Sequence, residues 1–265
     1  MTERELFLTA ILGCSRSDLY SRPPALTPDQ EQALVDMETR RRAGEPLQYI
    51  LGTWDFMGLT LKVDPHVLIP RPETEILVET VNRVVHEHLP PGDLTILDIG
   101  TGSGNMAIAL AKSLSTSRVT TIDISPDALS LARENARRHG VLDQIRFVLA
   151  DVKEFFRSLA KDGQRFHVIV SNPPYIPTSQ LSCLPLDVQQ EPQTALDGGA
   201  DGLYYLRQLI GRSGEFLHPG GTIFLEIGDG QGPAVLPMFS STIFGAPLFI
   251  KDYTGTDRVV WAKKI

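Results

Sequence analysis

Four consecutive residues carry groups that can bind a planar NH2 group: Asn172, Pro173, Pro174 and Tyr175. They follow the apolar run 166–170, which predicts a buried strand that two prolines must end. The prolines lack a backbone N–H, so their backbone offers only carbonyl oxygens, which accept hydrogen bonds. Asn172 Oδ1 and the Pro173 carbonyl can accept two N–H bonds from the group while Tyr175 stacks on its plane. A Pro-rich turn with a packing tyrosine is the alternative, which these residues alone do not exclude.

A glycine-rich loop lies upstream, at the first expected turn from strand to helix, with the sequence Asp98-Ile99-Gly100-Thr101-Gly102-Ser103-Gly104. Glycines let the backbone approach a ligand closely. The spacing G-x-G-x-G differs from the dinucleotide fingerprint G-x-G-x-x-G, and no P-loop lysine follows. This spacing disfavours a pyrophosphate site.

Two acidic residues follow the next two expected strands. Asp123 ends the second strand, where a carboxylate can reach a ribose diol, and Asp151 follows the third, where it can lie near an adenine edge. The glycine loop, the two acids and the Asn-Pro-Pro-Tyr loop thus share one edge of the expected sheet. Their order indicates a nucleoside site beside a site for an NH2 group.

Strands and helices are expected to alternate after residue 93, which predicts a parallel sheet with right-handed crossovers. A final pair of strands without a crossover helix is expected to be antiparallel, and 176–200 is expected to form a long functional loop. The expected strands are 94–99, 118–123, 145–149, 166–171, 222–227, 246–251 and 257–263, and the expected helices are 104–114, 126–139, 152–161, 202–217 and 231–240.

The first 45 residues predict a small helical domain, with one helix ending near Gly13 and another beginning at a Thr27 cap with Gln30 in the capping-box position. The pattern becomes strand-like from Gln48 to Val63 and predicts a β-hairpin. The next segment is Leu68-Ile69-Pro70-Arg71-Pro72-Glu73-Thr74-Glu75. Its prolines predict an extended stretch, which we interpret as lying across the mouth of the next domain. Its two glutamates predict the start of a helix that runs to about residue 88. Pro90-Pro91-Gly92-Asp93 marks a boundary.

Composition excludes several classes of function. The net charge of −7 at pH 7 disfavours binding of nucleic acid by charge alone. Cys14 and Cys183 are the only cysteines, so neither a disulfide framework nor a metal site is expected, and a reducing cytoplasm fits. No signal peptide is recognisable, and no apolar run approaches the ~20 residues of a membrane span. We expect a soluble cytoplasmic protein.

The order of motifs resembles the class I S-adenosylmethionine-dependent methyltransferases with an (Asn/Asp)-Pro-Pro-aromatic motif, which methylate NH2 groups conjugated to π systems. Within this class the chain is similar to the peptide-chain release factor glutamine N5-methyltransferase family from about residue 12 onward. The segments that carry the similarity are Gly44–Ile50, Leu68–Glu75, Ser171–Ile176, Glu191-Pro192 with Ala195, Leu196, Gly198 and Gly199, Leu225–Gly228, and Asp252–Arg258.

This resemblance implies an α/β architecture in three parts. A Rossmann-like class I methyltransferase domain with a seven-stranded, mostly parallel sheet is expected over 73–265. A helical substrate-recognition domain is expected over 1–45, and a β-hairpin linker over 46–72. The chain is expected to be a monomer.

The resemblance also implies the reaction and the residues that carry it. S-adenosylmethionine would donate a methyl group to the glutamine of the Gly-Gly-Gln motif in class 1 release factors, the implied protein partner. Asn172, Pro173 and Tyr175 are the implied catalytic residues, and with Pro174 they would bind the target amide. The implied cofactor-binding residues are Gly100, Thr101, Gly102, Ser103, Gly104, Asp123, Asp151, Val152 and Asn172.

Three alternatives stay open at this point. A ribosomal-protein glutamine methyltransferase would share the chemistry and differ in its partner. A DNA or RNA methyltransferase would place a flipped base in the same pocket, but the acidic balance and the lack of a long basic segment argue against it. An inert S-adenosylmethionine-binding module would be expected to lose Asn172 or a loop glycine, and both are present.

Overall fold

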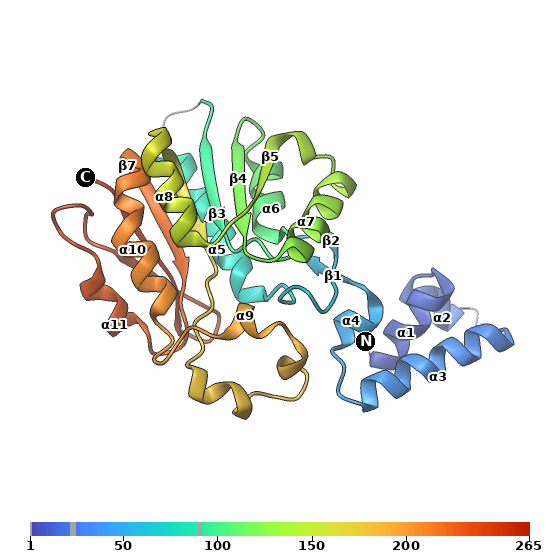
Figure 1. The fold of residues 1–265 in the computed structure, drawn as a ribbon. Helices are drawn as coiled ribbons and strands as arrows, with labels where there is room; N and C mark the ends of the chain where they lie inside the picture. The colour runs from blue at the N-terminus through green and yellow to red at the C-terminus, as the bar shows by residue number, and fades with distance from the viewer. Residues whose placement is uncertain (1, 22–24, 90–91) are drawn as a thin grey trace.

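The computed structural model describes residues 2–21, 25–89 and 92–265. A group of helices at the N-terminus is connected through a two-stranded hairpin to a large α/β domain (Figure 1). Pro90 and Pro91 of the expected boundary lie outside the described residues.

A seven-stranded sheet with the order β5-β4-β3-β6-β7-β9-β8 forms the centre of the α/β domain. All neighbouring strands from β5 to β7 are parallel, and β9 pairs antiparallel with both β7 and β8. The predicted fold class and the antiparallel C-terminal pair are therefore confirmed. The bounds are β3 (Thr95–Ile99), β4 (Arg118–Asp123), β5 (Ile145–Leu149), β6 (Phe166–Ser171), β7 (Leu217–Glu226), β8 (Leu248–Lys251) and β9 (Asp257–Lys263).

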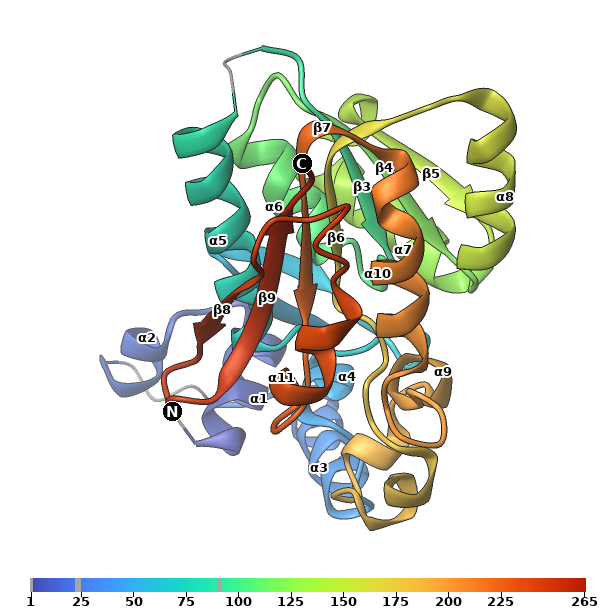
Figure 2. The same ribbon diagram turned by 90° about the vertical axis from the view of Figure 1, so that its left-hand side faces the viewer.

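The strands bury apolar side chains on both faces, as a doubly covered parallel sheet requires. Along β6, Val168 and Val170 belong to one core cluster, whereas Phe166 and Ile169 belong to the other. Figure 2 shows α5 and α6 on one side of the sheet and α8 and α10 on the other. The bounds are α5 (Pro72–His88), α6 (Asn105–Ser113), α7 (Pro126–Arg138), α8 (Val152–Asp162) and α10 (Tyr204–Phe216), with a 3-10 turn at Leu142–Gln144 before β5.

Two C-terminal segments differ from the sequence-based expectation. The helix expected over 231–240 is the short α11 (Gly232–Val235) followed by a 3-10 turn, Leu236–Met238, and Pro237 within that turn has no N–H to continue an α-helix. The expected loop 176–200 is partly helical. It contains the 3-10 turns Thr178–Cys183 and Val188–Gln190 and the short helix α9 (Gln193–Leu196).

The N-terminal helices follow the capping signals in the sequence. They are α1 (Glu3–Leu12), α2 (Arg16–Ser21), α3 (Pro28–Arg42) and α4 (Leu47–Leu51). Thr27 Oγ1 accepts from Gln30 N at 3.3 Å, and Gln30 Oε1 accepts from Thr27 N at 3.0 Å, which confirms the expected capping box. Gly13 ends α1 with a left-handed φ of 60°.

Helix α4 corrects the expectation of strand-like residues from Gln48. Adjacent residues of α4 enter different cores: Ile50 packs with Phe7 and Leu34, whereas Tyr49 packs with Val67. The Tyr49 hydroxyl also donates to the Val67 carbonyl at 2.5 Å. One helical turn thus joins the N-terminal helices to the rest of the chain. The expected hairpin follows directly, as β1 (Thr53–Phe56) and β2 (Leu59–Lys62).

Candidate active site

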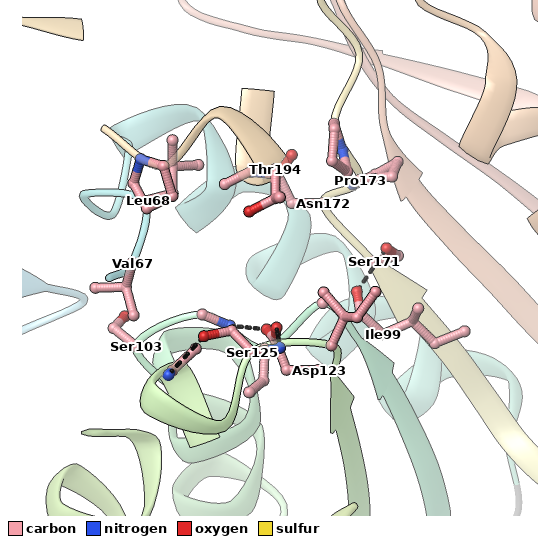
Figure 3. A pocket seen from close by; sticks show the side chains of 18 of the residues that line it. Val67, Leu68, Ile99, Ser103, Asp123, Ser125, Ser171, Asn172, Pro173 and Thr194 are labelled. Atoms are coloured by element: carbon pink, nitrogen blue, oxygen red, sulfur yellow. Dashed lines mark hydrogen bonds between the residues drawn. The ribbon is translucent and has the colours of Figure 1, made fainter. Parts of the chain in front are cut away.

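A pocket opens at the carboxyl ends of β3, β4 and β6, where the strand order reverses direction (Figure 3). Open α/β sheets bind ligands at such a point. Asp123, Ser125 and Ser103 line one side of the pocket, and Asn172 and Pro173 line the opposite side. Val67 and Leu68, from the segment before α5, also line it.

Backbone hydrogen bonds hold the glycine loop at the floor of this pocket. Gly100 N and Thr101 N both donate to the Ile122 carbonyl, at 2.9 and 3.1 Å. Gly100 and Gly102 have φ values of 77° and 54°, and a Cβ on either would meet no atom within 4 Å. The loop therefore adopts a shape that favours glycine and leaves open space above it for a ligand.

The last glycine of the loop has a different role from the others. Gly104 is the N-cap of α6 with a φ of 84°, and a Cβ there would lie 3.1 Å from Ala132 Cβ and 3.1 Å from Ile108 Cδ1. It permits close packing of α6 against α7 and does not itself line the pocket. Gly100, Thr101, Gly102 and Ser103 do line it.

Asp123 presents a carboxylate that the backbone fixes in place. One oxygen accepts from Gly102 N and the other from Ser125 N, both at 2.9 Å. Burial raises the pKa of Asp123, and these two backbone bonds oppose that shift. Each carboxylate oxygen keeps a further lone pair. The group can therefore still accept hydrogen bonds from a diol in the pocket.

Asp151 and Val152 lie where the sequence placed them, after β5 and at the start of α8, and both line the pocket. Asp151 is also the N-cap of α8, because its Oδ1 accepts from Lys153 N at 2.8 Å. This capping bond explains an aspartate at the position even without a ligand. Tyr205 and Ile124 line the same pocket and were not singled out from the sequence.

The Asn-Pro-Pro-Tyr loop separates two pockets. Asn172, Pro173 and Pro174 line the main pocket, whereas Tyr175 lines a second one beside it. Asn172 and Arg71 line both. The four predicted residues therefore divide between adjoining cavities, with Asn172 at the junction.

A buried ion pair connects the segment before α5 to the 176–200 loop. Glu191 is 5% exposed, accepts from Ile69 N at 3.0 Å and pairs with the Arg71 guanidinium. Burial raises the pKa of Glu191, and Arg71 opposes that shift. The pair holds the Leu68–Arg71 segment across the pocket, as its prolines had suggested. The sequence similarity included both residues but assigned neither a role.

These features define the class of the protein. A sheet of this order with a glycine loop and a fixed carboxylate at its switch point is a class I methyltransferase fold, and a family model described as a methyltransferase domain matches residues 92–233. The solved structure of a Thermus thermophilus 16S rRNA methyltransferase in complex with AdoMet and guanosine superimposes with a TM-score of 0.55 at 18% identity, and the match covers 80% of this chain and 50% of that chain. At that identity the likeness shows the fold alone.

Sequence similarity narrows the class to one family. A model described as the PrmC N-terminal domain matches residues 2–52. Release factor glutamine methyltransferases of Geobacter sulfurreducens and Moorella thermoacetica are each 45% identical to this chain, over 262 and 259 residues. The alignments cover 97% of this chain in both cases, and 87% and 88% of those proteins. The chain belongs to the release factor glutamine methyltransferase family, which confirms the resemblance seen in the sequence.

The pocket residues fit S-adenosylmethionine. The open space above Gly100 and Gly102 can receive the amino-acid part close to the backbone. The fixed Asp123 carboxylate suits ribose hydroxyls, and Val152 and Ile124 offer apolar surface to a base.

Proposed function

We propose that this protein transfers a methyl group from S-adenosylmethionine to the N5 amide nitrogen of the glutamine in the Gly-Gly-Gln motif of class 1 release factors. The observation that carries the proposal is the position of Asn172 between two adjoining pockets. One pocket fits a nucleoside-bearing methyl donor. The other can receive a side chain whose amide meets Asn172 and the Pro173 carbonyl. Family membership supports both assignments.

Within the main pocket, we assign Gly100 to Gly104 to the methionine part of the cofactor, with Gly104 acting through the close packing of α6 that it permits. Asp123 would accept hydrogen bonds from the ribose hydroxyls, and Asp151 and Val152 would lie beside the adenine. When bound, S-adenosylmethionine supplies an electrophilic methyl group on a sulfonium. The enclosing Leu68–Arg71 segment would keep water away from it.

The acceptor nitrogen needs help because it is a weak nucleophile. Its lone pair is delocalised into the carbonyl, the resonance that gives amides a rotational barrier of ~18–20 kcal/mol. Asn172 Oδ1 and the Pro173 carbonyl would accept its two N–H bonds, orient the lone pair and stabilise positive charge that develops on the nitrogen. Tyr175 would contact the face of the amide. Orientation and charge stabilisation then replace a general base, and the surplus N–H proton is released to solvent once the methyl group has been transferred.

The protein substrate needs a contact surface beyond the pocket. The end of α3 lies beside the 176–200 loop, because a Cβ on Gly44 would be 3.9 Å from Leu186 Cβ (Figure 2). Leu186 is 73% exposed. We assign release-factor recognition to this surface and to the helical domain 1–45, with 46–72 as the linker and 73–265 as the catalytic domain.

The proposed cellular location follows from the proposed substrate. A release factor acts on cytoplasmic ribosomes, so we place the protein in the cytoplasm, as a monomer without direct nucleic-acid contacts. Among the described residues, no helix is both long and apolar enough to cross a bilayer.

The test is intact-mass spectrometry of an unmethylated release factor incubated with this protein and S-adenosylmethionine. The proposal predicts one added methyl group, and methylation slowed by ~10²–10³-fold when Asn172 is replaced by alanine. An unmodified release factor, under conditions where binding of S-adenosylmethionine is demonstrated, would refute the assigned substrate.

A further inference from the structure

Three polar side chains from distant parts of the chain form a line that ends at the junction of the two pockets. Thr74 lies in the first turn of α5, Asn172 follows β6, and Glu226 ends β7. Asn172 Nδ2 donates to Thr74 Oγ1 at 3.0 Å, and Thr74 Oγ1 donates to Glu226 Oε2 at 2.7 Å. Thr74 is 1% exposed and Glu226 is 0% exposed.

The direction of these hydrogen bonds follows from the chemistry of the groups. An ionised carboxylate only accepts, so the Thr74 hydroxyl must give its single proton to Glu226. The hydroxyl oxygen then has only lone pairs to offer to Asn172. It therefore pairs with the NH2 of the Asn172 carboxamide and repels its oxygen. The buried charge of Glu226 thus selects one of the two orientations of an amide whose O and N have nearly the same shape.

This choice decides what the pocket offers to a substrate. With Nδ2 held by Thr74, Asn172 Oδ1 remains as an acceptor, and no side chain or backbone group in the described parts of the chain donates to it. A flipped carboxamide would instead present an NH2 to the incoming NH2 of the substrate. Two donors cannot pair, so the flipped orientation cannot bind the acceptor amide.

We propose that Thr74 and Glu226 are positioning residues that hold the Asn172 carboxamide with its oxygen toward the acceptor amide. The inference rests on the proposed function for its catalytic consequence. The orientation itself is a property of the free protein and can be tested separately.

The surroundings of Glu226 keep its carboxylate in place. The Tyr175 hydroxyl donates to its second oxygen, Oε1, at 3.3 Å, and burial raises the pKa of Tyr175, so that this hydroxyl stays a neutral donor. Arg258, from β9, faces the carboxylate and donates to the Ile227 carbonyl at 3.1 Å. Glu73, beside Thr74 on α5, is the other charged neighbour.

These neighbours make the line sensitive to pH. Burial raises the pKa of Glu226 to about 7, and Glu73 adds to that shift, whereas Thr74, Arg258 and Tyr175 oppose it. A protonated Glu226 can donate to the Thr74 hydroxyl, which then becomes free to donate to the Asn172 oxygen. The preference for one amide orientation is therefore present above pH of about 7 and is lost as the pH falls below it.

The first test follows the amide in the free protein. With 15N-labelled asparagine, the Asn172 NH2 signal is assigned by its absence in Asn172→Ala. The proposal predicts that this signal titrates near neutral pH in the wild type. The titration is expected to disappear in Thr74→Val and in Glu226→Gln. A signal that is insensitive both to pH and to Thr74→Val would overturn the proposal.

A matched control lies on the same helix. Thr80 is 3% exposed, and its hydroxyl donates to the Ile76 carbonyl of its own helix at 2.8 Å. Thr80→Val therefore removes a buried threonine hydroxyl from α5 without touching the line to Asn172. It should leave both the Asn172 titration and the turnover unchanged.

The second test measures catalysis on a release factor. Thr74→Val is expected to lower kcat by roughly 10- to 100-fold. This loss is smaller than the ~10²–10³-fold loss expected when a positioned hydrogen-bonding group is removed, because the Asn172 side chain is still present and only its orientation is no longer fixed. The Kd for S-adenosylmethionine should stay within about twofold, and Thr74→Ser should restore most of kcat. Equal losses of kcat in Thr74→Val and Thr80→Val would show that Thr74 contributes only to packing.

The two tests separate this inference from the proposed function. A wild-type protein that shows the Asn172 titration but methylates no release factor would keep the orientation and refute the substrate. Methylation of the release factor with full kcat in Thr74→Val would keep the function and refute the positioning role.

Discussion

Replacing Asp123 by asparagine is expected to weaken S-adenosylmethionine binding by about 10- to 100-fold. The carboxylate uses one oxygen for Gly102 N and the other for Ser125 N, and each oxygen keeps a further lone pair in a side chain that lines the pocket. In Asp123→Asn one of these oxygens becomes an NH2 that meets a backbone N–H. A hydrogen bond to a charged group contributes about 1.5–3 kcal/mol, and 1.4 kcal/mol is tenfold in Kd. Loss of one such bond to the ribose gives the stated range.

Isothermal titration calorimetry with S-adenosylmethionine and the cofactor product measures this change directly. Asp127→Asn is the matched control, because Asp127 lies in the first turn of α7 with a side chain that is 65% exposed. The apo protein should keep its thermal stability within a few degrees, because removing the buried charge relieves the desolvation that raises the Asp123 pKa. An unchanged Kd in Asp123→Asn would refute the ribose assignment.

Three further perturbations address other parts of the account. Asn172→Ala should lower kcat by ~10²–10³ with little change in cofactor Kd; an active variant in single-turnover assays would refute its role. Leu186→Asp should raise KM for a whole release factor far more than for a short Gly-Gly-Gln peptide, and equal effects would exclude this surface. Arg71→Met should destabilise the fold by about 3 kcal/mol, because it leaves the Glu191 carboxylate buried without its cation. Chemical denaturation measures this loss, and adding Glu191→Gln should recover part of it.

The sheet could be predicted because its signals are local. The strand over 118–123 and the one over 145–149 match β4 and β5, since each is a short run rich in β-branched or apolar residues between two helical segments. Thr27 and Gln30 likewise identified the start of α3, because a capping box lies within four residues. The acids and the Asn-Pro-Pro-Tyr loop then fell at one edge because parallel strands share their carboxyl ends.

Other elements depend on contacts that no local pattern contains. Helix α4 is five residues long, and its sides belong to two different cores, so neither a helical nor a strand period could be recognised. Thr74 and Glu226 are 152 residues apart in the chain, and their hydrogen bond depends on α5 packing against the sheet. The sequence similarity marked both segments but could not show that they meet at Asn172.

The most direct test of the central claim is a competition for the methyl group in one reaction. Heavy-methyl S-adenosylmethionine is supplied with equal amounts of an unmethylated release factor, ribosomal proteins and single-stranded nucleic acid, and the products are mapped by mass spectrometry. The heavy methyl is expected on the glutamine of the Gly-Gly-Gln motif, with no label above background elsewhere. A heavy methyl mainly on a ribosomal protein or on a base would contradict it.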